Sequence, residues 1–285
     1  MLAATRQALA EERLPALMRW SFASEGTAYW LGYVEGRLAK RLDDTEKARR
    51  LLAEGVAPAL LRRYDVLAET LPLPDRRREP SAVATLMKAL HPGPIFRSQD
   101  WMLAEVGGPA RGLAQILAGQ RWVRSLDAEA KWHEVTVHLG EMLVSLTEEL
   151  RDRLPHLSGF LGEACHAFGV QVGRGVKWSF DLPDDVESAI EVLRMGEYIF
   201  RVNPQHESGK RPDGSGYLEG NACPWFPRPG WGGMHCGIFG RFQDGCASVF
   251  GLDYRLKTTI PRHGGDVCRV ELRPIPPARL ARRRS

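Results

Sequence analysis

The pattern of apolar residues changes near Gly169, and this change constrains the fold more than any other feature of the sequence. Before it, apolar positions recur every three or four residues, as in Leu51, Leu52, Val56 and Leu60, which is typical of amphipathic helices. After it, short segments alternate between apolar and polar residues, which is typical of strands. Helices followed by strands predict an α+β fold. We therefore expect a helical N-terminal half packed on a small, mostly antiparallel C-terminal sheet.

Most of the first half is predicted to be helical. Residues 1–70 keep the helical spacing, and Pro15 and Pro58 are expected to mark helix starts or breaks. Further helices are predicted over Ser98–Leu117, Asp127–Leu154 and Leu157–Phe168. In Asp127–Leu154, leucines three or four residues apart form one apolar stripe, so this is the clearest helix of the chain.

The second half is predicted to contain short strands. They are Val176–Phe180, Glu197–Asn203, His235–Phe242, Leu252–Ile260 and Val267–Leu272. The last two are joined through Pro261–Gly265, whose Gly-Gly pair is typical of a hairpin. Pro183–Asp185 should begin a short helix with acidic residues in its first turn. His206–Tyr217 is expected to be a polar loop.

The segment Leu71–Pro80 is the best linker candidate, because it combines three prolines with a charge run. We divide the chain into a helical region (1–170), a Cys- and Gly-rich α+β region that carries the candidate site (171–275) and a basic tail (276–285).

The charge balance argues against nucleic acid as a partner. The formal net charge is only +4, a small excess for a nucleic-acid-binding surface. The basic runs Arg76–Arg78 and Arg279–Arg284 are expected to be a solvated loop and a chain terminus.

The chain is expected to be cytoplasmic, with no membrane partner. No apolar run approaches the roughly 20 residues that span a bilayer. Charged residues near the N-terminus stand where a signal peptide has its apolar core. Five cysteines, an odd number, indicate reduced thiols in a chain without an export signal.

The stretch Glu219–Leu272 holds four of the five cysteines and two of the eight histidines. These residue types ligate metals or act as nucleophiles. Successive cysteines in the stretch are 13, 10 and 22 residues apart, so no C-x-x-C knuckle indicates zinc. Cys223, Cys236 and Cys268 are candidates either for chemistry or for packing as small apolar side chains, whereas Cys246 is expected to pack.

Several neighbours could complete a site around these thiols. On the expected strand, His235 and Cys236 would face opposite sides. Asp266 follows a Gly-Gly turn and either caps that turn or orients a base or an amidine-like nitrogen. Trp225 and Trp231 stand in a Pro- and Gly-rich frame, where they either wall a small-ligand pocket or pack a loop.

Five short motifs stand in the last quarter of the chain: HC at 235–236, FQDG at 242–245, YRL at 254–256, TTI at 258–260 and GGDVC at 264–268. Together they resemble the C-terminal half of the L-2-amino-thiazoline-4-carboxylic acid hydrolase family. The family's named activity hydrolyses the C=N carbon of a thiazoline ring. The resemblance implies a hydrolase that acts on carbon–nitrogen bonds other than peptide bonds, in a small heterocyclic or C=N-containing substrate.

Two mechanisms are open under this resemblance. In one, a Cys236 or Cys268 thiolate is the nucleophile, His235 or His263 is the acid or base, and Asp266 orients it. In the other, cysteine and histidine hold a divalent metal, zinc or manganese, that activates water. The metal ligands would then be Cys223, Cys236, Cys268 and His235. Substrate binding is assigned to Arg255, Trp225 and Trp231, with Arg255 holding a carboxylate.

The glycine- and cysteine-containing hairpin also resembles, more weakly, the 4-vinyl-reductase-type domain, in which cysteines hold zinc beside a small-molecule pocket. This second resemblance implies a non-catalytic, zinc-stabilised binding module whose metal supports folding. Both functions have a small molecule as partner. A third alternative is a structural protein whose cysteines belong to the core.

Overall fold

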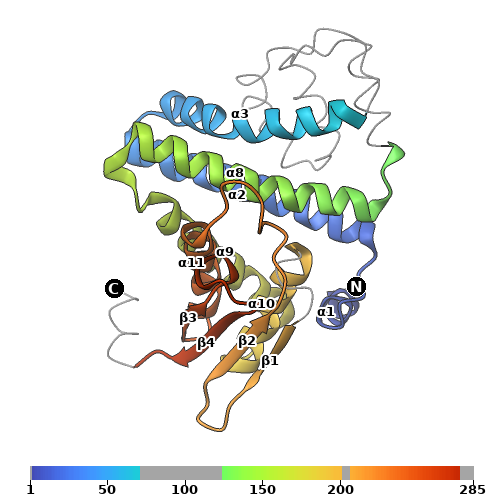
Figure 1. Cartoon of the computed structure of the whole chain (residues 1–285). Helices are drawn as coiled ribbons and strands as arrows, with labels where there is room; N and C mark the ends of the chain where they lie inside the picture. Colours follow the sequence, from blue (N-terminus) through green and yellow to red (C-terminus); the bar gives the residue numbers. More distant parts are fainter. Residues whose placement is uncertain (1, 71–123, 201–205, 277–285) are drawn as a thin grey trace. The chain divides into compact units, whose positions relative to one another are not determined.

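The structure, a computed structural model, describes residues 2–70, 124–200 and 206–276 (Figure 1). These residues are mostly helical, with one four-stranded antiparallel sheet in the C-terminal part. The predicted α+β class is therefore confirmed. The predicted linker Leu71–Pro80, the predicted helix Ser98–Leu117 and both basic runs lie outside the described residues.

The chain forms two compact units. A helical unit comprises Pro15–Ser158, and a sheet unit comprises Met1–Leu14 together with Gly159–Ser285. The predicted division at residue 170 falls inside α9 (Phe160–Phe180) of the sheet unit. Helix α1 (Leu2–Ala10) belongs to the sheet unit, where its Arg6 donates to both carboxylate oxygens of Glu191 at 2.7 and 2.8 Å.

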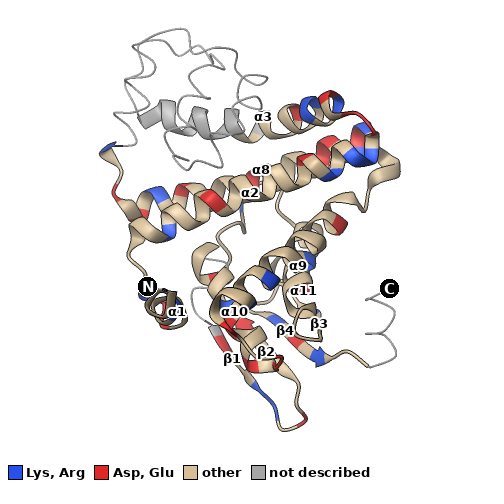
Figure 2. Cartoon of the chain, turned by 180° about the vertical axis from the view of Figure 1, so that it is seen from behind, with Lys and Arg blue, Asp and Glu red and all other residues tan. Residues whose placement is uncertain are grey.

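The helical unit contains three long helices among its described residues. They are α2 (Ala16–Leu42), α3 (Thr45–Thr70) and α8 (Ala128–Arg153). The predicted helix Asp127–Leu154 is confirmed as α8, whose first turn is capped by the Asp127 side chain accepting from the Ala130 amide at 2.7 Å. Acidic and basic residues are interspersed along α2 and α8 (Figure 2). Among the helices described, none has the length and apolar content needed to cross a membrane.

Prolines have different effects in the two helices where breaks were predicted. Pro15 stands directly before α2, as expected for a helix start. Helix α3, in contrast, continues through position 58, so the second predicted break is wrong.

The sheet unit packs helices α10 (Val186–Phe200) and α11 (Gly233–Ser248) against one face of its sheet. After α9 its elements are α10, β1 (His206–Lys210), β2 (Gly216–Gly220), α11, β3 (Leu252–Thr258), α12 (Ile260–His263) and β4 (Cys268–Pro274). The strand order is β1-β2-β4-β3, with every neighbouring pair antiparallel. Leu218, Val270 and Leu272 belong to the same buried cluster as Ile190 of α10 and Ala247 of α11. Burial of this apolar area between sheet and helices stabilises the unit.

The last two predicted strands are confirmed as β3 and β4. They pair antiparallel, with Leu256 opposite Val270. Their connection is longer than the expected tight hairpin because it contains α12, which the Thr259 side chain caps. Gly264 ends α12 in the left-handed region at φ +64°, where glycine is favoured.

Four local predictions in this unit are wrong. Val176–Phe180 is the end of α9, and His235–Phe242 lies in α11. Of the predicted strand Glu197–Asn203, Glu197–Phe200 is the end of α10, and residues 201–203 lie outside the described residues. The predicted polar loop His206–Tyr217 includes β1 and the start of β2. Short apolar runs do not distinguish a strand from a buried helix, and glycine lowers the intrinsic helix preference of the α11 segment. In the tertiary structure, packing against neighbouring elements stabilises the helical conformation of these segments.

Helices α9 and α11 cross with their backbones in contact. A Cβ atom at Gly245 of α11 would lie 2.1 Å from the carbonyl oxygen of His166, and one at Gly169 of α9 would lie 2.0 Å from that of Phe242. At the crossing, the Cys246 thiol donates to the Gly169 carbonyl at 3.3 Å, so Cys246 packs in the core as expected. Glycine at both positions fixes how closely α11 approaches α9.

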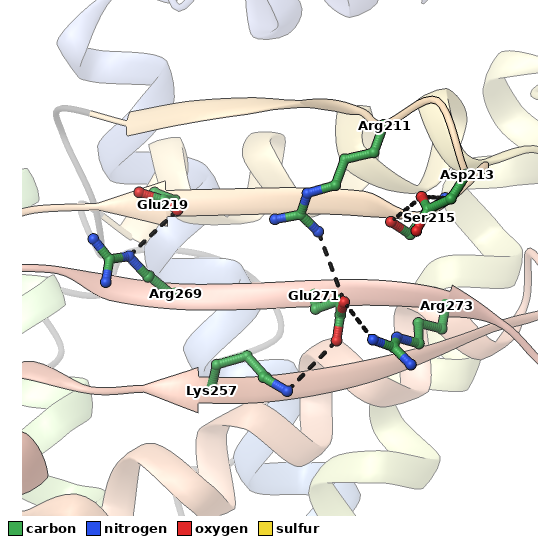
Figure 3. A network of polar contacts seen from close by, with 8 residues as sticks. All are labelled: Arg211, Asp213, Ser215, Glu219, Lys257, Arg269, Glu271 and Arg273. Carbon is green, nitrogen blue, oxygen red and sulfur yellow. Dashed lines mark hydrogen bonds and ion pairs between the residues drawn. The ribbon is translucent and has the colours of Figure 1, made fainter.

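The outer face of the sheet carries a network of charged side chains (Figure 3). Its centre is Glu271 of β4, which lies 2.9 Å from Arg273, 3.6 Å from Lys257 and 3.8 Å from Arg211. The hydrogen bond from Arg273, followed by the charges of the three cations, lowers the pKa of the Glu271 carboxyl.

We expect Glu271→Gln to lower the free energy of unfolding by about 0.5–1 kcal/mol at pH 7, a small figure because water screens the exposed cations. Since folding lowers the pKa of Glu271, its stabilisation is present above the unfolded pKa of about 4.3 and is lost as pH falls through the folded value. Urea unfolding of both proteins at pH 7 and at pH 3 checks this. The difference should be smaller at the lower pH, and a difference of equal size at both pH values contradicts it.

Candidate functional site

One cavity in the sheet unit collects several of the candidate residues. It lies between the inner face of the sheet, α10, α11 and the segment 221–232 that joins β2 to α11. Its volume is about 50 Å³, which is room for about four water molecules. Its described lining is made of thiol, aromatic, aliphatic and a few polar side chains and includes no Lys, Arg or His.

Three thiols from separate parts of the chain meet in this cavity. Cys223 follows β2, Cys236 lies in the first turn of α11, and Cys268 begins β4. The register of the sheet explains part of this convergence, because Cys268 pairs with Gly220, three residues before Cys223. Burial is the largest cause of the raised pKa of Cys223 and Cys236, and negative charge on Cys268 raises both further, so the three thiols are electrostatic neighbours.

Burial dominates the acidity of these thiols. Desolvation raises the pKa of Cys223 and Cys268, and it raises the pKa of Cys236 to about 12. N–H groups oppose this effect at each sulfur. Backbone amides following Cys223 and the amide of Ile260, 3.4 Å from the Cys268 sulfur, lower the pKa of those two thiols, and the Trp231 indole lowers that of Cys236. At neutral pH the thiols are therefore protonated.

Aromatic side chains form one wall of the cavity. Trp225 and Trp231 are both buried, and their ring centroids are 4.6 Å apart. Phe239 of α11 meets Trp225 edge-on at 5.1 Å. The two tryptophans thus combine both predicted roles, because they pack the 221–232 segment and also line a cavity.

A polar corner of the cavity was missed from the sequence. It consists of Glu197, Gln243 and Tyr254, and Glu197 is only 3% exposed. Glu197 lies at helical spacing from the buried Ile190 and Leu193. An acidic residue on the apolar stripe of a helix indicates a buried polar group. This pattern was missed from the sequence because Glu197–Asn203 was predicted to be a strand.

His235 stands beside the cavity and not in its described lining. It is buried, and its Nδ1 accepts the Gly232 amide at 3.1 Å, which caps the start of α11. The expected strand alternation of His235 and Cys236 is wrong, since both lie on a helix, where neighbouring side chains diverge by about 100°.

Three other candidates lie away from the cavity lining. His263 is exposed in α12, and its Nδ1 accepts the Thr259 amide at 3.0 Å. Asp266 is exposed in the turn before β4. Arg255 has a side chain that is 46% exposed and lies 3.9 Å from Asp253. The structure brings together Cys223, Cys236, Cys268, Trp225 and Trp231, and it leaves His263, Asp266 and Arg255 outside.

No arrangement of three Cys, His, Asp or Glu side chains in the described part of the chain could hold a metal ion as it stands. The three cavity thiols supply sulfur donors of the kind that zinc accepts. Each sulfur is carried by a single rotatable Cα–Cβ bond, so a metal would require the side chains to rotate toward one another.

Comparisons with protein-family models, with curated proteins and with solved structures gave no match for this chain.

Proposed function

We propose that this protein is a non-catalytic binding module whose cavity takes a small molecule beside a thiophilic metal ion held by Cys223, Cys236 and Cys268. The observation that carries the proposal is the meeting of these three thiols in one cavity, where the Ile260 amide also donates to the Cys268 sulfur at 3.4 Å. Donors of this kind around thiolates are the usual outer shell of a metal site. Zinc would supply the positive charge that the described lining lacks.

The aromatic wall supports the small-molecule part of the proposal. Concave sites of mostly apolar character with a few convergent polar groups are typical ligand pockets. Trp225, Trp231 and Phe239 provide the apolar wall, and Glu197 and Tyr254 provide polar groups on another side.

The hydrolase implied by the family resemblance is less well supported by the geometry. Attack at a C=N carbon requires a thiolate and a nearby acid or base. The Cys236 pKa is raised to about 12, and neither His235 nor His263 is among the lining residues. The hydrolase therefore stays a prediction, and the reactivity of the Cys236 thiol distinguishes it from the binding module.

Cadmium is a convenient probe of the proposed thiolate site, because Cd²⁺ is thiophilic and gives a sulfur-to-metal charge-transfer band in the ultraviolet. Titration of the metal-free, reduced protein should give a band that saturates at about one ion per chain. Cys223→Ser, Cys236→Ser and Cys268→Ser should each weaken binding by at least about tenfold, because each removes one thiolate ligand.

Cys165→Ala and Cys246→Ala are the matched controls, since both remove a buried thiol that does not line the cavity. They should leave the band and its saturation unchanged. The metal site is excluded if the wild-type protein gives no band, or if the cavity and control variants behave alike.

A further inference from the structure

The polar corner of the cavity is a directed chain of hydrogen bonds. The Tyr254 hydroxyl donates to the Gln243 Oε1 atom. The Gln243 Nε2 atom in turn donates to the Glu197 Oε1 atom at 3.2 Å. The three residues come from β3, α11 and α10, so the sheet and both helices hold the chain in place.

This direction decides what the corner offers to a ligand. A tyrosine hydroxyl has one proton, and that of Tyr254 is committed to Gln243, which leaves the oxygen lone pairs as acceptors. The Glu197 carboxylate has only acceptor positions when ionised. A ligand that contacts the Tyr254 oxygen or the ionised Glu197 carboxylate therefore has to donate hydrogen bonds.

The negative charge of Glu197 also favours a ligand that donates hydrogen bonds. Negative charge on Glu197 raises the pKa of both Tyr254 and Cys268, after the larger effect of burial in each case, so its field reaches the neighbouring lining residues. A charge-assisted bond to a buried carboxylate is about twice as strong as a neutral one. A ligand that carries positive charge gains this interaction, whereas an anion is repelled.

We propose that the cavity selects small cationic N–H donors, namely protonated amines and amidines, and that Glu197 is the residue that recognises them. This inference rests on the proposed function only in that the cavity is a ligand site; it does not require the metal. The volume of about 50 Å³ limits the enclosed part of the ligand to about four non-hydrogen atoms. A carboxylate-bearing substrate would need a cation that the described lining does not provide.

Three molecules of nearly equal size and different charge test the selectivity. Acetamidinium, acetamide and acetate each have four non-hydrogen atoms and carry charges of +1, 0 and −1. With 5-fluorotryptophan in place of tryptophan, ¹⁹F NMR of the full chain reports binding at Trp225 and Trp231, whose resonances are assigned with Trp→Phe variants. Acetamidinium should shift these two resonances at about millimolar concentration, and acetate should not shift them.

Glu197→Gln keeps the size of the side chain and removes its charge, so it should weaken acetamidinium binding by at least about tenfold. Glu219→Gln is the matched control, because Glu219 pairs with Arg269 at 3.3 Å on the outer face of the sheet (Figure 3). It should bind as the wild type does. Unchanged acetamidinium binding by Glu197→Gln overturns the role of Glu197.

The wild-type series decides the selectivity even if Glu197→Gln does not fold. Equal or tighter binding of acetate overturns the preference for cations and leaves the cavity as a ligand site. Binding of none of the three molecules overturns both the preference and the small-molecule part of the proposed function. The cadmium titration tests the metal part separately.

Discussion

Replacing Gly245 by alanine is expected to lower the free energy of unfolding of the sheet unit by about 3 kcal/mol or more. The added methyl group would lie 2.1 Å from the carbonyl oxygen of His166 and 2.8 Å from the amide nitrogen of Val170. Both atoms belong to the α9 backbone, so no side-chain rotation relieves the clash and the helices have to separate. The gain of up to about 1 kcal/mol in helix propensity on changing glycine to alanine is too small to compensate.

Alanine at Gly237 of α11 and at Gly175 of α9 provides the control, because a Cβ built at either position has no atom within 4 Å other than the adjacent residues and backbone of its own helix. These variants should be as stable as the wild type or more stable, by up to about 1 kcal/mol. Hydrogen exchange of peptides from β4 and α11 measures the effect within the sheet unit. Equal protection in Gly245→Ala and Gly237→Ala would show that the backbones do not touch at this crossing.

Cys236 is expected to react with iodoacetamide at pH 7.5 at least about 50-fold more slowly than an unperturbed thiol. Its pKa is raised from 9.0 to about 12, which lowers the thiolate fraction by about a thousandfold at this pH. The higher intrinsic nucleophilicity of a more basic thiolate recovers only about twentyfold of this loss. Since the raised pKa is the cause, the rate should rise about tenfold per pH unit through the alkaline range.

Mass spectrometry of the Cys236 peptide after timed alkylation gives this rate, and the same peptide from the urea-unfolded chain supplies the unperturbed reference. The ratio of the two rates removes the effect of local sequence. Alkylation of the folded protein at or above the unfolded rate would mean a thiolate at neutral pH. That result would favour the cysteine hydrolase over the binding module.

Elements with a local origin were predictable from the sequence. The helix α8 combines a leucine stripe with a capping Asp127, and both signals lie within the segment itself. The strands β3 and β4 have one face toward the core, and this produces their alternation. In such segments local preference and tertiary packing agree.

Helix α11 could not be predicted in this way. Its glycines weaken the helical pattern, yet Gly245 is required where the helix crosses α9. The misassigned end of α10 likewise concealed Glu197, whose position in the cavity depends on its being helical. In both segments a long-range contact overrides a weak local signal.

The sequence by itself determined the α+β class, the final antiparallel strand pair and the stretch in which the thiols gather, because periodicity and composition are properties of neighbouring residues. Only the tertiary structure decided which candidates meet. Sheet register and the α9–α11 crossing bring Cys223, Cys236 and Cys268 into one cavity and add Glu197 from α10. They also leave His263, Asp266 and Arg255 outside it, since each of these lies on an exposed surface.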